Sequence, residues 1–192
     1  VPECAEFHPR GSLTVRTLKI SEGRVEVDGK TVFASDAGFD AFIREAFRSR
    51  GSANMKFYKM DSACKLAYVA AEWILDGIEF GEEECAVLMS GRYGSLDTDM
   101  NHQSIIDRDG DDYAAPSVFV YTLPNVAAAE ISIRHHIKGE NIWFSDAPMA
   151  ELRHQAELAS ARESLKYCLV GRSDFINGEY LAIFELLRFG EV

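Results

Sequence analysis

The chain has 192 residues, 47% of them hydrophobic and 11% aromatic, which is enough for one globular domain with a sizeable core. Its formal net charge of −11 argues against non-specific nucleic-acid binding, because that binding depends on basic side chains that neutralise phosphates. The longest nearly apolar run, Leu66 to Leu75, is too short for a membrane span of roughly 20 residues, and no signal-peptide pattern precedes it, so we expect a cytoplasmic protein without a membrane partner.

The first predicted elements are three short antiparallel strands. Alternating side chains favour strands at Leu13 to Ile20, Arg24 to Val27 and Thr31 to Phe33. Glu22-Gly23 and Asp28-Gly29 supply the turns, and an Asp-Gly pair is a strong hairpin signal. The amino-terminal part therefore predicts a small β-meander.

Two buried helices are expected after the meander. The first ends at Gly51, and its apolar side chains recur at the spacing of one helix face: Phe39, Phe42, Ile43, Ala46 and Phe47. The second is capped within Lys59-Met60-Asp61-Ser62, runs to Asp76 and is apolar on nearly all sides. Both helices therefore belong to the core.

A buried strand and an acidic helix come next. Cys85 to Met89 is a short apolar run typical of a strand in a parallel sheet, and a glycine-containing turn separates it from a helix at Leu96 to Ile106. That turn does not match the sequence motif of a nucleotide-binding loop, because it has neither GxGxxG nor a GKS/T ending. The acidic run at 107–112 lacks the glycine and the closing glutamate of a calcium loop, so we expect no metal there.

The last third of the chain predicts a helix, a strand, a second helix and two strands. Thr122 and Pro124 open a helix that closes at Gly139, and three alanines at 127–129 let another element approach its backbone closely, as at a crowded interface. The strand is Asn141 to Ser145. The second helix is expected at Ala147 to Leu169, and its buried side comprises Leu152, Ala156, Ala159, Leu165 and Cys168. The closing strands are expected at Phe175 to Asn177 and Tyr180 to Leu187.

The stretch Pro116 to Ser145 resembles the helix and strand that lead into the catalytic cysteine of the β-ketoacyl-acyl carrier protein synthases, in the thiolase superfamily. Gly171-Arg172-Ser173-Asp174 is similar to the Gly-Glu-Ala-Asp of that family, and the resemblance runs from about Lys59 to Tyr180. It implies one α/β domain over 1–192, with a meander and linking helix in 1–57 and a three-layer αβα half of the thiolase fold in 58–192. The implied sheet is mixed, mainly parallel and five-stranded.

The resemblance also locates the position of the family's nucleophile, and no cysteine stands there. Counting forward from Asn141 puts that position at Pro148, and counting back from Gly171 puts it near His154. The family's second half, which supplies two histidines or a histidine and an asparagine for decarboxylation, has no counterpart in this sequence. Thiol acyl transfer needs a thiolate and groups that stabilise the oxyanion. We therefore expect no catalytic residue.

The cysteines and histidines predict neither a metal site nor a cofactor site. Cysteines at positions 4, 64, 85 and 168 form no CxxC pair and are expected to be reduced. His135 and His136 are adjacent, so on a helix they point about 100° apart rather than toward one metal ion. Cys168 is expected near the far end of the last helix, about three to four turns from the lost nucleophile, which is too distant to replace it.

In dimers of the resembled family, the strand that corresponds to Asn141 to Ser145 pairs with its twin across a two-fold axis. The resemblance therefore implies a homodimer, or a heterodimer with an active ketosynthase, whose interface contains Asn125, Ala128, Ile142, Trp143 and Phe144. Residues 44–65 carry six basic and two acidic side chains, a local charge of +4. A solvated surface accounts for this charge, and the alternative is docking of an acyl carrier protein at Arg48, Lys56, Lys59 and Arg134.

Three functional hypotheses follow. The first is a non-catalytic β-ketoacyl synthase-like subunit that acts as a dimerisation or scaffold partner in fatty-acid or polyketide-type (polyene lipid) biosynthesis. The alternative is a 3-oxoacyl-acyl carrier protein synthase-type acyltransferase component that is active only with a partner subunit. It would either complete a site on that catalytic partner or use His154 or Cys64. The third is a small-molecule binding module in the pocket vacated by the catalytic groups.

Overall fold

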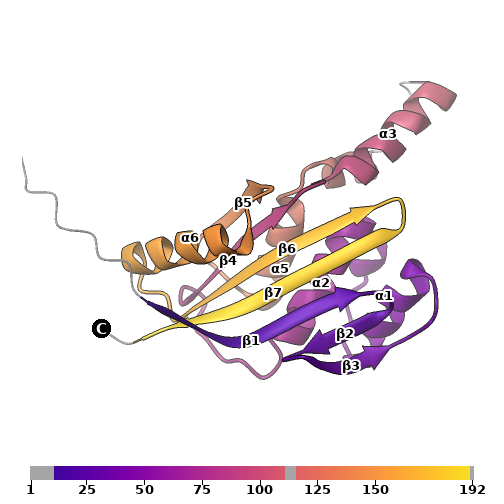
Figure 1. Ribbon diagram of the computed structural model, residues 1–192. Coiled ribbons are helices and arrows are strands. Elements are labelled where there is room, and N and C mark those ends of the chain that lie inside the picture. Colours follow the sequence, from indigo (N-terminus) through magenta and orange to yellow (C-terminus); the bar gives the residue numbers. More distant parts are fainter. Residues whose placement is uncertain (1–10, 111–115, 191–192) are drawn as a thin grey trace, which may run out of the picture.

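The computed structural model describes residues 11–110 and 116–190, so Cys4 and the acidic residues at 111 and 112 lie outside the described residues. Its centre is one seven-stranded sheet with the strand order β3-β2-β1-β7-β6-β4-β5 (Figure 1). The strands are β1 (Ser12–Ser21), β2 (Arg24–Val27), β3 (Lys30–Ala34), β4 (Cys85–Gly91), β5 (Asn141–Ser145), β6 (Tyr167–Ile176) and β7 (Glu179–Phe189).

The sheet differs from the predicted one in size and strand direction. Among the described strands, parallel pairing is confined to β4 with β5 and β4 with β6, and the other four pairings are antiparallel. The meander belongs to the same sheet, because β1 pairs with β7 along most of its length. A tight turn at Asn177-Gly178, where both residues have positive φ, sends β7 back beside β6. The prediction of a mainly parallel five-stranded sheet beside a meander is therefore wrong in these respects.

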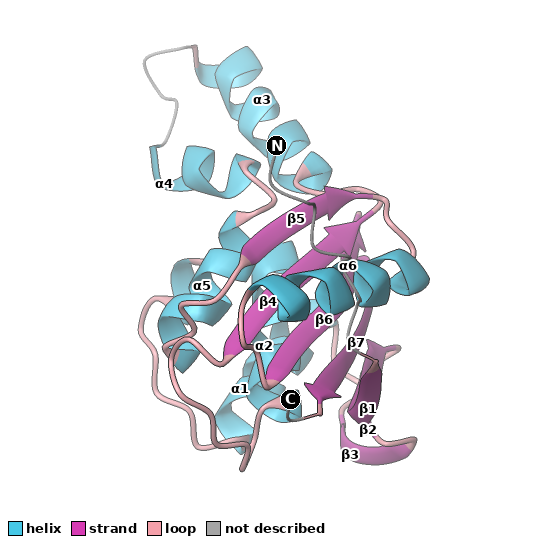
Figure 2. Ribbon diagram, turned by 90° about the vertical axis from the view of Figure 1, so that its left-hand side faces the viewer, coloured by secondary structure: helices cyan, strands magenta, loops and turns pink. Residues whose placement is uncertain are grey.

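Helices cover both faces of the sheet (Figure 2). One face carries α1 (Phe39–Ser49), α2 (Ser62–Ile74) and α5 (Val126–His135), and the other carries α6 (Met149–Arg162). β4 is buried on both sides: Val87 and Met89 belong to the core under α2 and α5, whereas Ala86 and Leu88 belong to the core under α6. A strand that is covered on both faces is expected to be a continuous apolar run, and residues 85–89 of β4 form such a run. The predicted three-layer α/β arrangement is confirmed.

Most predicted elements are present, some with shifted ends. Within the segment 59–62 predicted to cap α2, the cap residue is Asp61, since its Oδ1 accepts a hydrogen bond from the Cys64 backbone N–H at 2.8 Å. The helix expected from Pro124 begins at Val126. The helix expected to reach Leu169 ends at Arg162, and Cys168 lies on β6 instead. Cys168 packs in the core under α6, whereas the next residue, Leu169, packs in the core on the opposite face of the sheet. Successive side chains that point to opposite faces are the pattern of a strand rather than of a helix.

α3 (Leu96–Asp109) projects from the body of the molecule beyond the end of β4, and α4 (Pro116–Phe119) and the 3-10 helix η3 (Val120–Thr122) lie beside it (Figures 1 and 2). Four large apolar side chains on these helices are exposed: Leu96, Met100, Phe119 and Val120. None of the helices in the described ranges is both long enough and apolar enough to cross a bilayer.

Candidate functional site at the end of β5

The parallel strands β4, β5 and β6 end at the same edge of the sheet. In register, Gly91 lies beside Ser145, and Ser90 lies between Phe144 and Arg172. The carboxyl ends of parallel strands are where α/β proteins place their ligands. We call the turn from β5 into α6, residues 146–148, the β5–α6 elbow. Pro148, the first position predicted for a lost nucleophile, belongs to this turn.

One arginine of β6 holds the β5–α6 elbow. Arg172 donates from Nη2 to Asp146 Oδ1 at 2.7 Å and from Nη1 to the Ala147 carbonyl at 3.0 Å. Asp146 has a φ of 49°, and its N–H donates to the Gly91 carbonyl at 3.0 Å. Pro148 is the N-cap residue of α6 and has no N–H. Pro148, one of the two positions that the resemblance gives to the nucleophile, is therefore part of a turn that an arginine of another strand holds in place.

A second acidic residue orders the neighbouring turn. Asp174, on β6, accepts hydrogen bonds from the backbone N–H groups of Arg92 at 2.6 Å and Tyr93 at 3.0 Å. Gly91 enters this turn, and a Cβ added to it would lie 2.6 Å from the Ser173 carbonyl oxygen, so the close approach requires glycine. The resemblance of residues 171–174 to a family motif does not predict that Asp174 orders this turn. The backbone N–H groups that it binds lie 82 and 81 residues earlier in the chain.

His154, the second position predicted for a lost nucleophile, is exposed on α6. The preceding residue anchors the helix to the sheet, since Arg153 donates to both carboxylate oxygens of Glu185 on β7, at 2.6 and 2.5 Å. Successive helical side chains point about 100° apart. His154 therefore faces solvent while Arg153 faces the sheet.

The three described cysteines are buried free thiols. Burial raises the pKa of Cys64 and of Cys168 well above the usual value, and it raises the pKa of Cys85 to about 12. The thiolate is the nucleophilic form of cysteine. Cys64 lines a cavity of about 20 Å³, which has room for about one water molecule. These thiols are therefore suited to packing rather than to acyl transfer.

Solved structures share this architecture at low sequence identity. The ishigamide ketosynthase/chain length factor is 15% identical with a TM-score of 0.69, over 94% of this chain and 63% of that one. AntDE:AntF, a type II PKS acyl-carrier protein in complex with its ketosynthase, is 13% identical with a TM-score of 0.68, over 95% of this chain and 63% of that one. A β-ketoacyl synthase from Burkholderia phymatum STM815 is 11% identical with a TM-score of 0.63, over 95% and 60%. No protein-family model and no curated protein matches the sequence.

The chain has the ketosynthase fold. The resemblance to the β-ketoacyl synthases is thereby confirmed at the level of the fold. The chain spans less than two thirds of the length of these three matched chains, 60% to 63%. Within this ketosynthase fold, the described part of the chain presents no thiol at the β5–α6 elbow.

β5 is an edge strand of the described sheet, and its three apolar residues are half buried. Ile142 and Phe144 pack against the core under α6, and Trp143 packs against the core on the opposite face. Asn125 is exposed at the start of α5. Ala128, by contrast, is fully buried, where α5 packs against α2. The crowded contact of the alanines therefore lies within the chain, which corrects the predicted place of Ala128 at a dimer interface.

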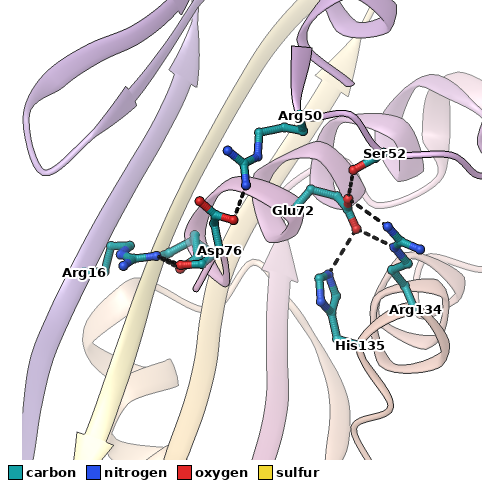
Figure 3. Close-up of polar contacts among 8 residues, drawn as sticks. Arg16, Arg50, Ser52, Glu72, Asp76, Arg134 and His135 are labelled. Atoms are coloured by element: carbon teal, nitrogen blue, oxygen red, sulfur yellow. Dashed lines mark hydrogen bonds and ion pairs between the residues drawn. The ribbon is translucent and has the colours of Figure 1, made fainter. Parts of the chain in front are cut away.

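Two of the four basic residues predicted to dock a carrier protein are paired with buried glutamates. Arg134 donates to Glu72 from Nε at 2.7 Å and from Nη2 at 3.3 Å (Figure 3). The ammonium of Lys56 lies 2.5 Å from Glu130. Glu72 and Glu130 are only 7% and 5% exposed. Arg134 and Lys56 therefore neutralise carboxylates of their own chain.

The other two basic residues of that set lie at the surface. Arg48 donates from Nε to the Tyr58 hydroxyl at 3.3 Å, and its guanidinium lies 5.8 Å from the centre of the Tyr58 ring. Lys59 is exposed. Of the four predicted docking residues, Arg48 and Lys59 are therefore the ones that are not committed to a buried carboxylate.

Glu72 is the centre of a polar cluster between α2, α5 and the linker that follows α1 (Figure 3). Ser52 Oγ donates to Glu72, and His135 Nε2 lies 3.4 Å from Glu72 Oε1. Burial raises the pKa of Glu72, but hydrogen bonds from Arg134 and Ser52 outweigh it, so its pKa lies below the usual value. Burial lowers the pKa of His135. Sequence reasoning missed this cluster, because Glu72 interrupts a helix that is otherwise read as apolar core.

The cluster is not a metal centre. Within residues 11–110 and 116–190, no group of three or more His, Cys, Asp or Glu residues is placed to hold a metal ion. The cluster borders an open cavity of about 400 Å³. Its charges are already paired within the chain, so it is suited to joining α2 to α5.

Proposed function

We propose that this protein is a non-catalytic ketosynthase-like subunit that binds a ketosynthase partner in polyketide or fatty-acid chain building. The observation that carries the proposal is the β5–α6 elbow, where Arg172 holds a turn that contains Pro148 and no thiol. The raised pKa values of the described thiols support the same conclusion, because acyl transfer needs a reactive thiolate.

The surface that we assign to the partner is the outer edge of β5. In the described part of the chain β5 pairs with β4 alone, and an edge strand offers unpaired backbone groups to a strand of another chain. Pairing there would continue the sheet into a second subunit. A solved structure named as a ketosynthase/chain length factor supports a partner of the ketosynthase type.

We also propose that an acyl carrier protein contacts the assembled pair through Arg48 and Lys59. Both side chains lie at the surface, within a segment that is basic in an otherwise acidic chain. At physiological salt the screening length is about 8 Å, so a local basic surface can attract an acidic partner despite the net charge. The matched structure of an acyl-carrier protein with its ketosynthase supports such a partner.

Co-purification with a type II ketosynthase tests the partner role. We expect the two chains to elute as one complex. A double variant, Asn141→Lys with Ser145→Lys, places charges at the exposed ends of β5 and should weaken binding by about tenfold or more. The matched control, Thr31→Lys with Val32→Lys, changes exposed residues of β3 at the opposite edge and should leave binding intact. Separate elution of the two chains, or equal binding by both variants, would contradict the proposal.

A further inference from the structure

A second cavity, of about 270 Å³, lies between the amino-terminal ends of α2 and α3 and the segment formed by α4 and η3. Its wall combines amines and hydroxyl groups from Lys59, Ser62, Lys65, Thr98, Ser117 and Tyr121. Met60 and Val118 supply apolar surface beside them. The cavity is therefore rich in hydrogen-bond donors and carries a small apolar region.

Lys65 is the unusual member of this wall. Only 7% of the residue is exposed, and within residues 11–110 and 116–190 its ammonium makes neither a hydrogen bond nor an ion pair. The Nζ atom is not among the fully buried polar atoms and lines the cavity, so its unpaired charge has only the limited contact with water that the cavity allows, which is costly. The position adds to the cost, because Lys65 lies near the start of α2, where side chains lean toward the positive end of the helix dipole.

The charged groups around Lys65 compensate its charge only in part, although Asp61 and Asp40 both attract it. Asp61 is already engaged, since Oδ1 accepts from the Cys64 N–H at 2.8 Å and Oδ2 accepts from the Thr98 hydroxyl at 2.5 Å. Burial raises the pKa of Asp61, which weakens it further as a counter-ion. On α1, Asp40 attracts the Lys65 ammonium and Arg44 repels it. Burial lowers the pKa of Lys65, as expected of an ammonium without a close partner.

We propose that this cavity binds the carboxylate of a small organic acid, which pairs with the Lys65 ammonium and accepts hydrogen bonds from the surrounding hydroxyls. One carboxylate matches the single ammonium of the largely buried Lys65, whereas Lys59, the other lysine of the wall, is exposed. Asp61 and Asp97 line the same cavity, and their carboxylates would repel a doubly charged phosphate more strongly than a singly charged carboxylate. The ligand is small, because drug-sized ligands occupy pockets of roughly 300–1,000 Å³. Met60 and Val118 suit a short alkyl chain. The site does not depend on the proposed partner role.

Thermal unfolding in sodium butyrate tests the site. Sodium chloride at equal ionic strength is the reference, butyramide is the uncharged analogue, and inorganic phosphate is a second anion. A ligand that binds only the folded state raises Tm. We expect butyrate to raise Tm, phosphate to raise it less, and butyramide to leave it at the chloride value.

Two variants localise the effect. Lys65→Met keeps much of the side-chain volume, and replacing an uncompensated buried charge with an apolar group should leave the protein folded. Calorimetric titration should show butyrate binding weakened by about tenfold or more in this variant. Lys30→Met, at an exposed lysine of β3, should bind butyrate as the wild type does. In the wild type, binding should also weaken as the pH is raised through the lowered pKa of Lys65, a measurement that needs no variant.

The proposal is overturned if butyrate raises Tm no further than chloride and butyramide do. It is equally overturned if Lys65→Met binds butyrate as tightly as the wild type. Tighter binding of phosphate than of butyrate would overturn the assignment of the ligand as a carboxylate.

Discussion

Arg172 fixes the course of the chain where β5 turns into α6. Its guanidinium bonds the Asp146 side chain and the Ala147 carbonyl, and so ties β6 to a turn 25 residues earlier. The contact cannot be predicted from the sequence, because no local sequence pattern indicates which distant residue an arginine will bind. The cap of α2 is different: Asp61 bonds a backbone group three residues away, and local contacts of that kind can be predicted.

Replacing Arg172 tests this reading at the residue scale. Arg172→Met removes the donors to Asp146 and to the Ala147 carbonyl, so we expect the free energy of unfolding to fall by about 1–3 kcal/mol. Urea unfolding measures the loss. Arg24→Met, at an exposed arginine of β2, is the matched control and should change stability by no more than about 0.5 kcal/mol. Equal effects in the two variants would show that Arg172 does not hold the β5–α6 elbow.

At the scale of elements, the cluster around Glu72 adds an ionic contact to the apolar packing of α2 against α5. The folded-state pKa of Glu72 is below the ordinary value, so its contribution is complete above the ordinary pKa and is lost as the pH falls through the lowered one. The pKa of His135 is also lowered in the folded state, so below its ordinary value of about 6.5 the unfolded chain takes up the proton first. Both groups therefore make the protein less stable in acid.

Glu72→Gln tests the contribution of this carboxylate. The variant should be less stable than the wild type by about 1–3 kcal/mol near neutral pH, because Arg134 loses its ionic partner. Its stability should also depend less steeply on pH in the acidic range, as measured by urea unfolding from about pH 4 to pH 8. The exposed Glu22→Gln is the control. A pH dependence as steep as that of the wild type would assign the acid sensitivity to other groups.

The helices and strands differ in how well they could be predicted from the sequence. β5 was predictable with both of its ends, because Gly139 and Asp146 flank a short run of apolar residues. The start of β6 was not, since the run at 168–170 suits a buried helix and a buried strand equally well. The joining of β1 to β7 was also out of reach, because residues at opposite ends of the chain carry no local signal of their pairing.

At the scale of the whole molecule, helices lie on both faces of the sheet, and the outer edge of β5 is not paired with any described strand. The two cores on either side of β4 are built from apolar side chains, so burying them does not require a nucleophile at the β5–α6 elbow. The cavity at Lys65 could not be predicted from the sequence. Whether a lysine in an apolar helix has an acidic partner becomes visible only when the positions of the neighbouring helices are known.

The most direct test of the central claim is the intact mass of each chain after incubation with an acyl-carrier-protein or acyl-CoA thioester, in the presence and absence of a ketosynthase partner. We expect the partner to gain the mass of the acyl group and this chain to remain unmodified, because its described thiols are buried and its elbow holds none. A stoichiometric acyl adduct on this chain, at Cys64, His154 or any other side chain, would contradict the claim that it is non-catalytic.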